Sequence, residues 1–420
     1  MSLSKSLRIR DLLEVPLIIP GQGVFVFTTE ANTCSFVFSN KNLTDGILVN
    51  WSETEVRVTR TSSETYLDPK NSTGKSAGRF ADNSAGRFAD NSAGRFADNS
   101  AGLVSNKEAF YWFSIDAQNQ RLYAGVGEAR LETSIYSYQL PHSSDDERKA
   151  NKAFLESLTT VGTFVNALPL KLLRDPITNK LPHLVRSSAS LDAIAKGLFM
   201  PISHLSPVSR QMYECIKDCQ LDTDDFPEFS QAIQQSILDG WCHKRLLEKS
   251  SEFSKTDPNV DETYLRITLS ENNGESPGIP YVLEIWPAGH YSPVHSHGNA
   301  EAIIKVLHGD IQVQLFPYLS AGVLPFATAS FTKDDVMWIS PNLNQIHQLR
   351  NVRTGEPCMT IQCYMYDNED MTHYDYFDYL DEKGIKQYEP DSDMDFADFK
   401  ELMKKEWANR KPNVFACFGQ

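Results

Sequence analysis

The stretch PAGHYSPVHSHGNAEAIIKVLHGD, residues 287–310, decides the fold that we expect for the last third of the chain. His295 and His297 are two residues apart, and on a β-strand this spacing puts both imidazoles on one face. Gly289 and Pro293 precede them and favour a turn that leads into the strand. The stretch therefore predicts a strand that presents two nitrogen ligands on the same side.

Strand-like runs continue on both sides of this stretch, over residues 262–366. They are rich in β-branched, aliphatic and aromatic residues, and they read TYLRITL, YVLEIW, AIIKVLHGDIQVQLF, DVMWIS and MTIQCYMY. The series predicts a compact antiparallel barrel, which we place at residues 256–370. A third histidine, His347, follows DVMWIS and the turn PNLNQ, and a barrel can fold it back against the strand of His295.

Together the three histidines predict a metal site. Neutral imidazoles suit iron, copper, nickel or zinc, and open positions for substrate and oxygen favour Fe(II) and oxygenase chemistry. Glu301 follows the histidine pair closely enough to supply a fourth ligand. The sequence leaves open both a site of three histidines and a site with this added carboxylate.

Residues 1–142 predict a β-sandwich-like module. Short runs of β-branched and aromatic residues alternate with polar turns at residues 34–39, 46–51, 55–60, 109–115 and 134–140. These runs carry no catalytic signature, so we expect a structural or interaction module that could bind a sugar or a protein. The octapeptide SAGRFADN occurs three times in tandem, and we expect residues 76–102 to form a disordered loop without catalytic function.

Residues 143–255 predict a helical segment, because apolar residues recur at helical spacing in DDERKANKAFLESL, SRQMYECIKDC and SQAIQQSILDGWCHKRLL. Residues 371–420 predict an acidic tail with one amphipathic helix near 394–408. The expected fold class is therefore mainly β, with an N-terminal β-sandwich, a helical middle segment and a C-terminal barrel.

The charge and the cysteines of the chain limit its partners and its location. The chain has 420 residues and a formal net charge of −15, so it lacks the basic surface that a nucleic-acid partner needs. No run approaches the ~20 apolar residues that span a bilayer, so we expect no membrane partner. The seven cysteines are scattered and odd in number, and no signal peptide is recognisable, which predicts a reduced, cytoplasmic protein.

Residues 206–366 resemble the cysteine dioxygenase family of thiol dioxygenases. The resemblance rests on an ordered set of motifs. These are W-x-x-G-H-x(4)-H-x-H at Trp286, Gly289, His290, His295 and His297, Tyr-x-Arg at Tyr264 and Arg266, and the spacing of His347, Asn351 and Tyr364. The helical segment before the barrel also fits this family.

The resemblance implies a cupin (double-stranded β-helix) barrel and a role for each matching residue. His295, His297 and His347 would hold Fe(II), with positions left for a small thiol and for O₂. Arg266, beside Tyr264, would bind the substrate carboxylate as a planar fork, and Tyr364 would lie near the bound oxygen. The implied activity is the oxidation of cysteine or a related small thiol carboxylate to its sulfinic acid.

Three positions depart from the family pattern. Ala302 replaces the cysteine that cross-links to the tyrosine in animal members, so no thioether can form. The Ser-x-His-x-Tyr relay has Gln362 in place of its histidine, and an amide does not titrate. Glu301 adds a carboxylate, which leaves open a different cupin oxygenase with Glu301 as fourth ligand and a non-thiol substrate. A non-enzymatic binding protein with a cupin barrel and a sandwich is the third alternative.

Overall fold

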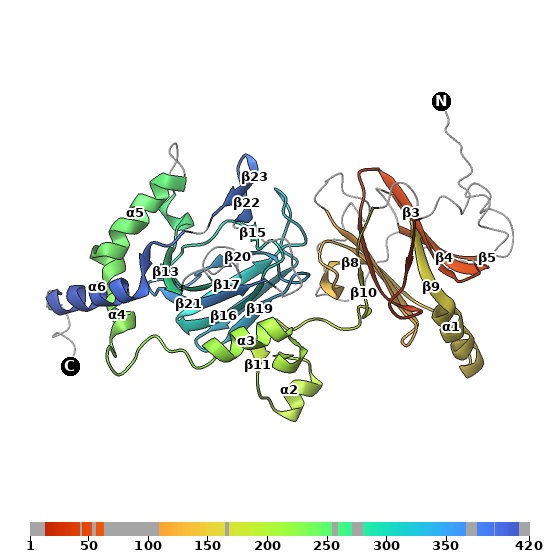
Figure 1. Ribbon diagram of the computed structural model, residues 1–420, viewed down its shortest axis with the longest axis horizontal. Coiled ribbons are helices and arrows are strands. Elements are labelled where there is room, and N and C mark those ends of the chain that lie inside the picture. The colour runs from red at the N-terminus through yellow and green to blue at the C-terminus, as the bar shows by residue number, and fades with distance from the viewer. Residues whose placement is uncertain are drawn as a thin grey trace. The chain divides into compact units, whose positions relative to one another are not determined.

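The computed structural model describes residues 13–42, 44–52, 56–62, 109–163, 168–253, 259–270, 280–366, 376–389 and 391–410. The chain divides into two compact units, Met1–Lys180 and Leu181–Gln420. Both units are built mainly from strands (Figure 1), so the predicted fold class is confirmed. The tandem repeat at residues 76–102 lies outside the described residues. No described helix has the length and apolar character needed to cross a membrane.

Two five-stranded sheets form the described part of the N-terminal unit. One has the order β1 (Leu13–Pro16), β9 (Leu158–Thr163), β3 (Thr33–Asn40), β4 (Asp45–Ser52), β5 (Val56–Ser62). The other has the order β10 (Leu168–Leu173), β2 (Gln22–Thr28), β6 (Tyr111–Asp116), β7 (Arg121–Val126), β8 (Ser134–Gln139). Between the sheets, buried aromatic rings from Phe25 and Phe36 lie with centroids 5.2 Å apart. The predicted sandwich is therefore confirmed.

The sandwich extends further along the chain than we expected. Residues 143–255 were predicted as a helical segment. The first helix, α1 (Asp145–Ser157), is instead followed by two strands, β9 and β10, which complete the two sheets before the later helices begin. The helical spacing of apolar residues in α1 runs straight into β9 and hides its start. The pairing partners of β9 also lie more than a hundred residues away, for example Phe38 opposite Val161, so no local pattern reveals them.

The C-terminal unit contains two six-stranded sheets. The first, here the large sheet, has the order β19 (Val336–Ile339), β16 (Glu301–His308), β21 (Cys358–Met365), β14 (Tyr281–Trp286), β13 (Leu265–Ser270), β24 (Met394–Asp395). The second, here the small sheet, has the order β18 (Ala327–Thr332), β17 (Asp310–Leu315), β20 (Ile346–Arg350), β15 (His295–Ser296), β22 (Phe377–Asp381), β23 (Gly384–Tyr388). The strands from β14 to β17 alternate between the sheets, and so do those from β18 to β21. This order is that of a double-stranded β-helix, so the predicted barrel is confirmed.

The barrel also takes strands from the segment that we predicted as a tail. Residues 371–420 supply β22, β23 and β24 before the expected helix α6 (Phe396–Asn409). β22 pairs with β15, so Tyr379 lies opposite His295. The aromatic and acidic composition of this segment concealed short strands, and the partners of β22 and β24, β15 and β13, lie some eighty and more than a hundred residues earlier.

One face of the large sheet lines the barrel and the other is covered by helices. In β16, Ala302 and Ile304 face the barrel interior, whereas Ile303 and Leu307 pack against the helical side. This alternation follows from the two-residue period of a strand. The sheet is therefore buried on both faces.

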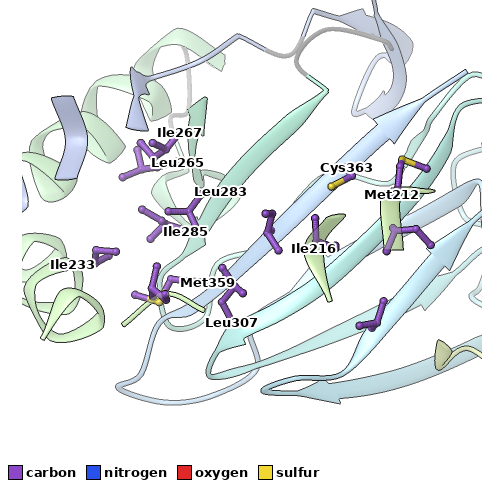
Figure 2. Close-up of a cluster of buried hydrophobic side chains, with 14 of the residues drawn as sticks. Met212, Ile216, Ile233, Leu265, Ile267, Leu283, Ile285, Leu307, Met359 and Cys363 are labelled. Atoms are coloured by element: carbon purple, nitrogen blue, oxygen red, sulfur yellow. The ribbon is translucent and has the colours of Figure 1, made fainter. Parts of the chain in front are cut away.

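Four helices cover the outer face of the large sheet (Figure 1). They are α3 (Pro207–Ile216), α4 (Phe229–Asp239), α5 (Trp241–Phe253) and α6; two smaller elements precede them, α2 (Leu191–Ala195) and the sheet of β11 (Val185–Arg186) with β12 (Met200–Pro201). Figure 2 shows the apolar core between helices and sheet, with Met212 and Ile216 of α3 close to Cys363. Each fully buried Leu or Ile stabilises this packing by about 1.5–3 kcal/mol, so the sheet is a rigid support for its inner face.

Candidate metal centre

Three histidine side chains converge inside the barrel. His295 and His347 lie opposite each other on β15 and β20, and His297 follows directly after β15. The Nε2 atoms of His295 and His297 are 3.1 Å apart, and those of His297 and His347 are 3.3 Å apart. All three ligand atoms lie within 4.8 Å of one another. The prediction that a residue fifty positions downstream returns to the His-x-His strand is confirmed.

The donor atoms of this cluster fit a metal ion. Nitrogen ligands held at ~2.0–2.1 Å from one ion in tetrahedral or octahedral geometry are roughly 3 Å apart, which is the separation found here. His295 Nδ1 donates to the Pro293 carbonyl at 3.0 Å and His347 Nδ1 donates to the Asn344 carbonyl at 2.9 Å. These bonds leave Nε2 of His295 and Nε2 of His347 as the unprotonated atoms. The facing lone pairs repel one another, and a cation between them removes that repulsion.

Burial keeps the three imidazoles uncharged. It lowers the pKa of His295 to about 4 and that of His347 to about 3, and it lowers the pKa of His297 well below its usual value. Desolvation is the largest cause at each residue, and the neighbouring histidines add to it for His297 and His347. The cluster is therefore neutral near pH 7, which is the form that binds a metal.

Tyr364 and Phe377 enclose the cluster on one side. The Tyr364 ring stacks on His297 with centroids 5.0 Å apart and an interplanar angle of 16°. The Phe377 ring meets His297 edge-on at 4.3 Å. The Tyr364 hydroxyl donates to Oε1 of Gln362, and burial raises its pKa well above the usual value. This tyrosine therefore stays protonated beside the histidines.

Arg266 lies in the same interior, and its partner is Glu284, which also binds Gln362. Its Nη1 donates to Oε1 of Glu284 at 3.0 Å, and both side chains are 2% exposed. Oε2 of Glu284 accepts from Nε2 of Gln362. Among the described residues, Nε and Nη2 of Arg266 have no hydrogen-bond partner. These two atoms form one edge of the guanidinium fork, the edge that can pair with a carboxylate in two parallel bonds, and the Tyr264 hydroxyl lies within reach of the same guanidinium.

Glu284 is a residue that the sequence reasoning missed. Glu284 is on β14, where it lies opposite Arg266 of β13 and opposite Thr360 of β21. It therefore belongs to the inner face of the sheet. Burial raises its pKa to about 7, although Arg266 favours the carboxylate form. The signal was present, because an acid in the apolar strand YVLEIW needs a buried cation as its partner.

Tyr264, predicted to help bind the substrate, is stacked on Trp286. The two ring centroids are 4.1 Å apart at an angle of 16°. Burial raises the pKa of its hydroxyl, with Glu284 as a second cause, while Arg266 acts in the opposite direction. Tyr264 therefore stands beside the Arg266–Glu284 pair.

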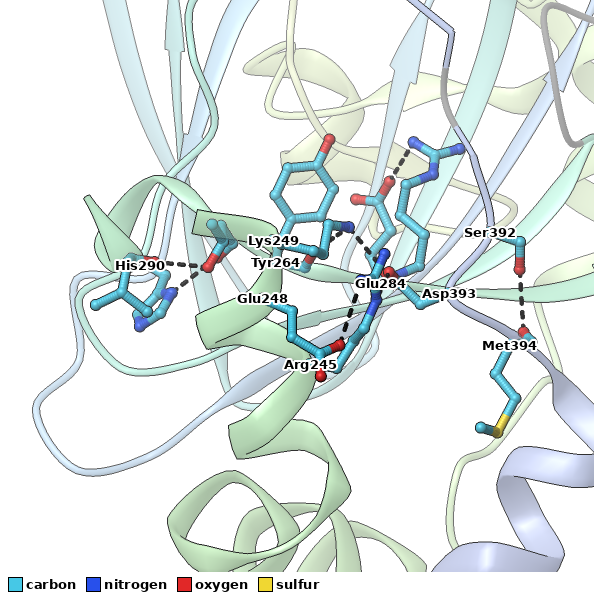
Figure 3. A network of polar contacts seen from close by, with 12 residues as sticks. Arg245, Glu248, Lys249, Tyr264, Glu284, His290, Ser392, Asp393 and Met394 are labelled. Carbon is cyan, nitrogen blue, oxygen red and sulfur yellow. Dashed lines mark hydrogen bonds and ion pairs between the residues drawn. The ribbon is translucent and has the colours of Figure 1, made fainter. Parts of the chain in front are cut away.

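Asp393 holds the backbone of β13 in place (Figure 3). Its carboxylate accepts from Arg245 Nε at 2.8 Å, from Lys249 Nζ at 2.9 Å and from the backbone N–H of Arg266 at 2.8 Å. Lys249 also donates to the carbonyl of Tyr264 at 2.8 Å. This network links α5 to β13, the strand that carries Arg266. It therefore fixes the backbone of the arginine without contacting its guanidinium.

Glu301 does not join the histidines. Its Oε2 accepts hydrogen bonds from Ser206 and, at 2.5 Å, from Ser209, both at the start of α3 on the outer face of the sheet. Of the two sites that the sequence left open, the structure has the one of three histidines without Glu301. The reason is the strand period, which turns this residue away from the side that Ala302 faces. A carboxylate at the N-terminus of a helix is also stabilised by the helix dipole.

Lys305, four residues along β16, binds the other end of the same helix. Its Nζ donates to the carbonyls of Lys217 and Cys219 at 2.7 and 2.9 Å. Glu301 and Lys305 thus attach both ends of α3 to one strand.

Comparison with known proteins gives short and partial matches. No protein-family model matches the chain. A stretch of 105 residues is 26% identical to cysteine dioxygenase type 1 of Danio rerio and covers 24% of this chain and 50% of that protein. The chain therefore spans about half the length of the curated relative that it matches.

Solved structures with similar features are described as cupins. The cupin domain of Schizosaccharomyces pombe Cnp3 is 16% identical, with a TM-score of 0.20, over 25% of this chain and 61% of that chain. A cupin superfamily protein of Desulfitobacterium hafniense is 10% identical, with a TM-score of 0.19, over 25% of this chain and 79% of that chain. The fold assignment itself rests on the order of the two sheets.

The C-terminal unit is a cupin barrel. Its interior holds a three-histidine cluster that could bind a metal ion, and the predicted Tyr364, Arg266 and Tyr264 lie around it. The remaining motif residues have structural contacts, since the side-chain amide of Asn351 donates to the carbonyl of Trp286 at 3.0 Å and His290 Nδ1 donates to the carbonyl of Thr263 at 2.7 Å.

Proposed function

We propose that this protein is an Fe(II)-dependent thiol dioxygenase that oxidises cysteine or a related small thiol carboxylate to a sulfinic acid. The observation that carries the proposal is the position of Arg266, which is buried with two unpaired guanidinium nitrogens in the same interior as three neutral histidines. The similarity to cysteine dioxygenase over 105 residues supports it. The identity of the metal is part of the proposal.

His295, His297 and His347 would hold the iron, which, when bound, would activate the thiol and O₂ for transfer of both oxygen atoms to sulfur. Nε and Nη2 of Arg266 would receive the substrate carboxylate as a bidentate pair and so orient the thiol toward the histidines.

Tyr364 would present its hydroxyl oxygen as an acceptor on the side of His297, because burial keeps the hydroxyl protonated and its one proton is donated to Gln362. In the Ser-x-His-x-Tyr relay of the cysteine dioxygenase family, Gln362 stands here in place of the histidine. Its side chain accepts a hydrogen bond from Tyr364 and donates one to Glu284. Gln362 would hold the tyrosine in place without exchanging a proton with it. Tyr364 is therefore a neutral hydroxyl in a fixed position.

An oxygen electrode and mass spectrometry test this proposal. Protein loaded anaerobically with Fe(II) should consume O₂ with cysteine and release the sulfinic acid, and His295→Ala should lose both the iron and the activity. Arg266→Gln should keep the iron but raise the KM for cysteine, with a smaller change for cysteamine, which has no carboxylate. If the iron-loaded protein consumes no O₂ with any small thiol of the panel, the proposal fails.

For the remaining predictions we add two proposals. The N-terminal sandwich could bind a sugar or a protein. A glycan array tests the sugar, with a protein that lacks residues 1–180 as the control.

A reduced cytoplasmic location is consistent with the six described cysteines, which are all free. Fractionation of the native cells tests this location.

A further inference from the structure

An apolar cavity of about 20 Å³ lies inside the barrel, and His347 forms part of its wall. This volume exceeds the ~10–15 Å³ that one water-sized molecule requires. The two sheets provide opposite walls: Val313, Leu315 and Ala329 come from the small sheet, and Ile304, Met337 and Ile339 come from the large sheet.

The strand register brings this apolar wall next to the histidine cluster. Leu315 lies directly opposite His347 across β17 and β20. Val313 lies opposite Ala329, and Ile304 lies opposite Met337. A molecule in the cavity therefore contacts one of the three histidines from the side that carries aliphatic groups.

The wall also contains the side chains of His183, Trp338, Asn344 and His347, and these have partners within the protein. Nδ1 of His347 donates to the backbone carbonyl of Asn344, and the side-chain amide of Asn344 donates to the carbonyl of Trp338 at 2.9 Å. A buried water needs two to four polar partners, so an aliphatic cavity of this kind favours a small apolar molecule over water.

The cavity and Arg266 lie on different parts of the large sheet. Met337 and Ile339 belong to β19 at one edge, and β16, β21 and β14 separate that strand from β13, which carries Arg266. A ligand in the cavity would therefore not compete with a carboxylate for the arginine.

We infer that this cavity is a binding site for dioxygen beside the histidine cluster. The identity of the gas rests on the proposed dioxygenase function, whereas the preference for a small apolar molecule rests on the lining alone. Dioxygen is small, apolar and a required co-substrate of that reaction, and in this cavity it would lie beside His347 without competing for Arg266.

Xenon is the probe for this site, because it occupies apolar cavities without needing the reaction. Crystals of the iron-loaded chain under xenon pressure should show xenon between Val313, Ala329 and His347. Ala329→Leu should fill the cavity and abolish xenon binding. The matched control is Thr328→Leu, which adds the same side chain at the exposed neighbouring position of β18; it should keep the xenon.

Turnover supplies the second readout. Ala329→Leu should raise the KM for O₂ several-fold, with the iron content and the KM for the thiol unchanged, and Thr328→Leu should change none of the three. Absence of xenon from the wild-type cavity overturns the inference, and so does an unchanged KM for O₂ in an Ala329→Leu protein that has lost xenon. Xenon bound in a protein that consumes no O₂ with any thiol refutes the proposed function and the gas named here, but leaves an apolar ligand site.

Discussion

Ala302 lies directly opposite Tyr364 across β16 and β21. Opposite residues on paired strands have Cβ atoms ~4.5–5.5 Å apart, and Cys363, next in sequence to the tyrosine, points to the helical side. The described part of the interior therefore places no thiol beside Tyr364. The position that holds a cysteine in animal cysteine dioxygenases is the right one for a cross-link, but here it carries a methyl group.

Ala302→Cys should therefore restore the cross-link. With Fe(II), thiol and O₂ as the oxidant, the new sulfur should bond to the Tyr364 ring, and the thiol hydrogen and one ring hydrogen should leave. Intact-mass spectrometry should detect the loss of two hydrogens and peptide mapping the joined residues. Ala302→Cys combined with Tyr364→Phe is the control and should keep its full mass. An unmodified mass for the single variant after many turnovers would contradict the proposed iron chemistry at this site.

Replacing Glu301 should affect stability and leave the metal in place. In Glu301→Ala, the hydroxyls of Ser206 and Ser209 lose a buried acceptor, which costs about 1–3 kcal/mol of unfolding free energy. Because the carboxylate points away from the histidines, the affinity for Fe(II) should match that of the wild type. Urea denaturation and metal titration measure the two effects. A sharp fall in metal affinity at unchanged stability would restore the four-ligand alternative.

Glu284→Gln should increase the preference for carboxylate thiols. The change leaves the charge of Arg266 uncompensated, so a substrate carboxylate gains the full attraction, while the protein loses about 3–5 kcal/mol of stability. The KM for cysteine should fall several-fold relative to that for cysteamine. Asp393→Asn is the matched control, since it disturbs the buried charges behind β13 without touching the guanidinium. Equal KM ratios in the wild type and Glu284→Gln would show that Glu284 does not set the selectivity.

Metal-free protein should lose stability as the pH falls below about 6.5. The pKa of His295 in the folded protein is about 4 and that of His347 about 3, so the unfolded chain takes up protons that the folded chain does not. Each residue then destabilises the fold by about 1.4 kcal/mol per pH unit between its unfolded and folded pKa.

Glu284 acts in the opposite direction, because its raised pKa of about 7 makes the folded state bind the extra proton between pH 4.5 and 7. Comparison of the wild type with His347→Gln cancels that contribution. Unfolding free energies of both proteins from pH 4 to 7.5 should give a shallower slope for the variant. Parallel curves would mean that His347 is protonated in the folded state.

The barrel and its histidines were predictable because their signal is local. The His-x-His spacing and the apolar strands each follow from a short motif and a two-residue period, and the predicted barrel then folds His347 back against the strand of His295. β9, β22 and Glu284 were missed because their meaning depends on partners distant in sequence: Phe38 for β9, His295 for β22 and Arg266 for Glu284. The role of Glu301 stayed open because its spacing from His297 does not show which face of the strand it occupies.

The place of β22 in the barrel has a consequence for how the protein is made. His295 lies on a two-residue strand between β20 and β22, and Phe377 of β22 covers His297. The N-terminal sandwich is complete at Leu173, whereas β22 and β23 end only at Tyr388. At ~5–20 residues per second, a ribosome needs roughly 2–8 s to translate the 41 residues from His347 to Tyr388. During that time the nascent histidines have no finished enclosure, so iron delivered before translation ends would meet a solvent-exposed cluster.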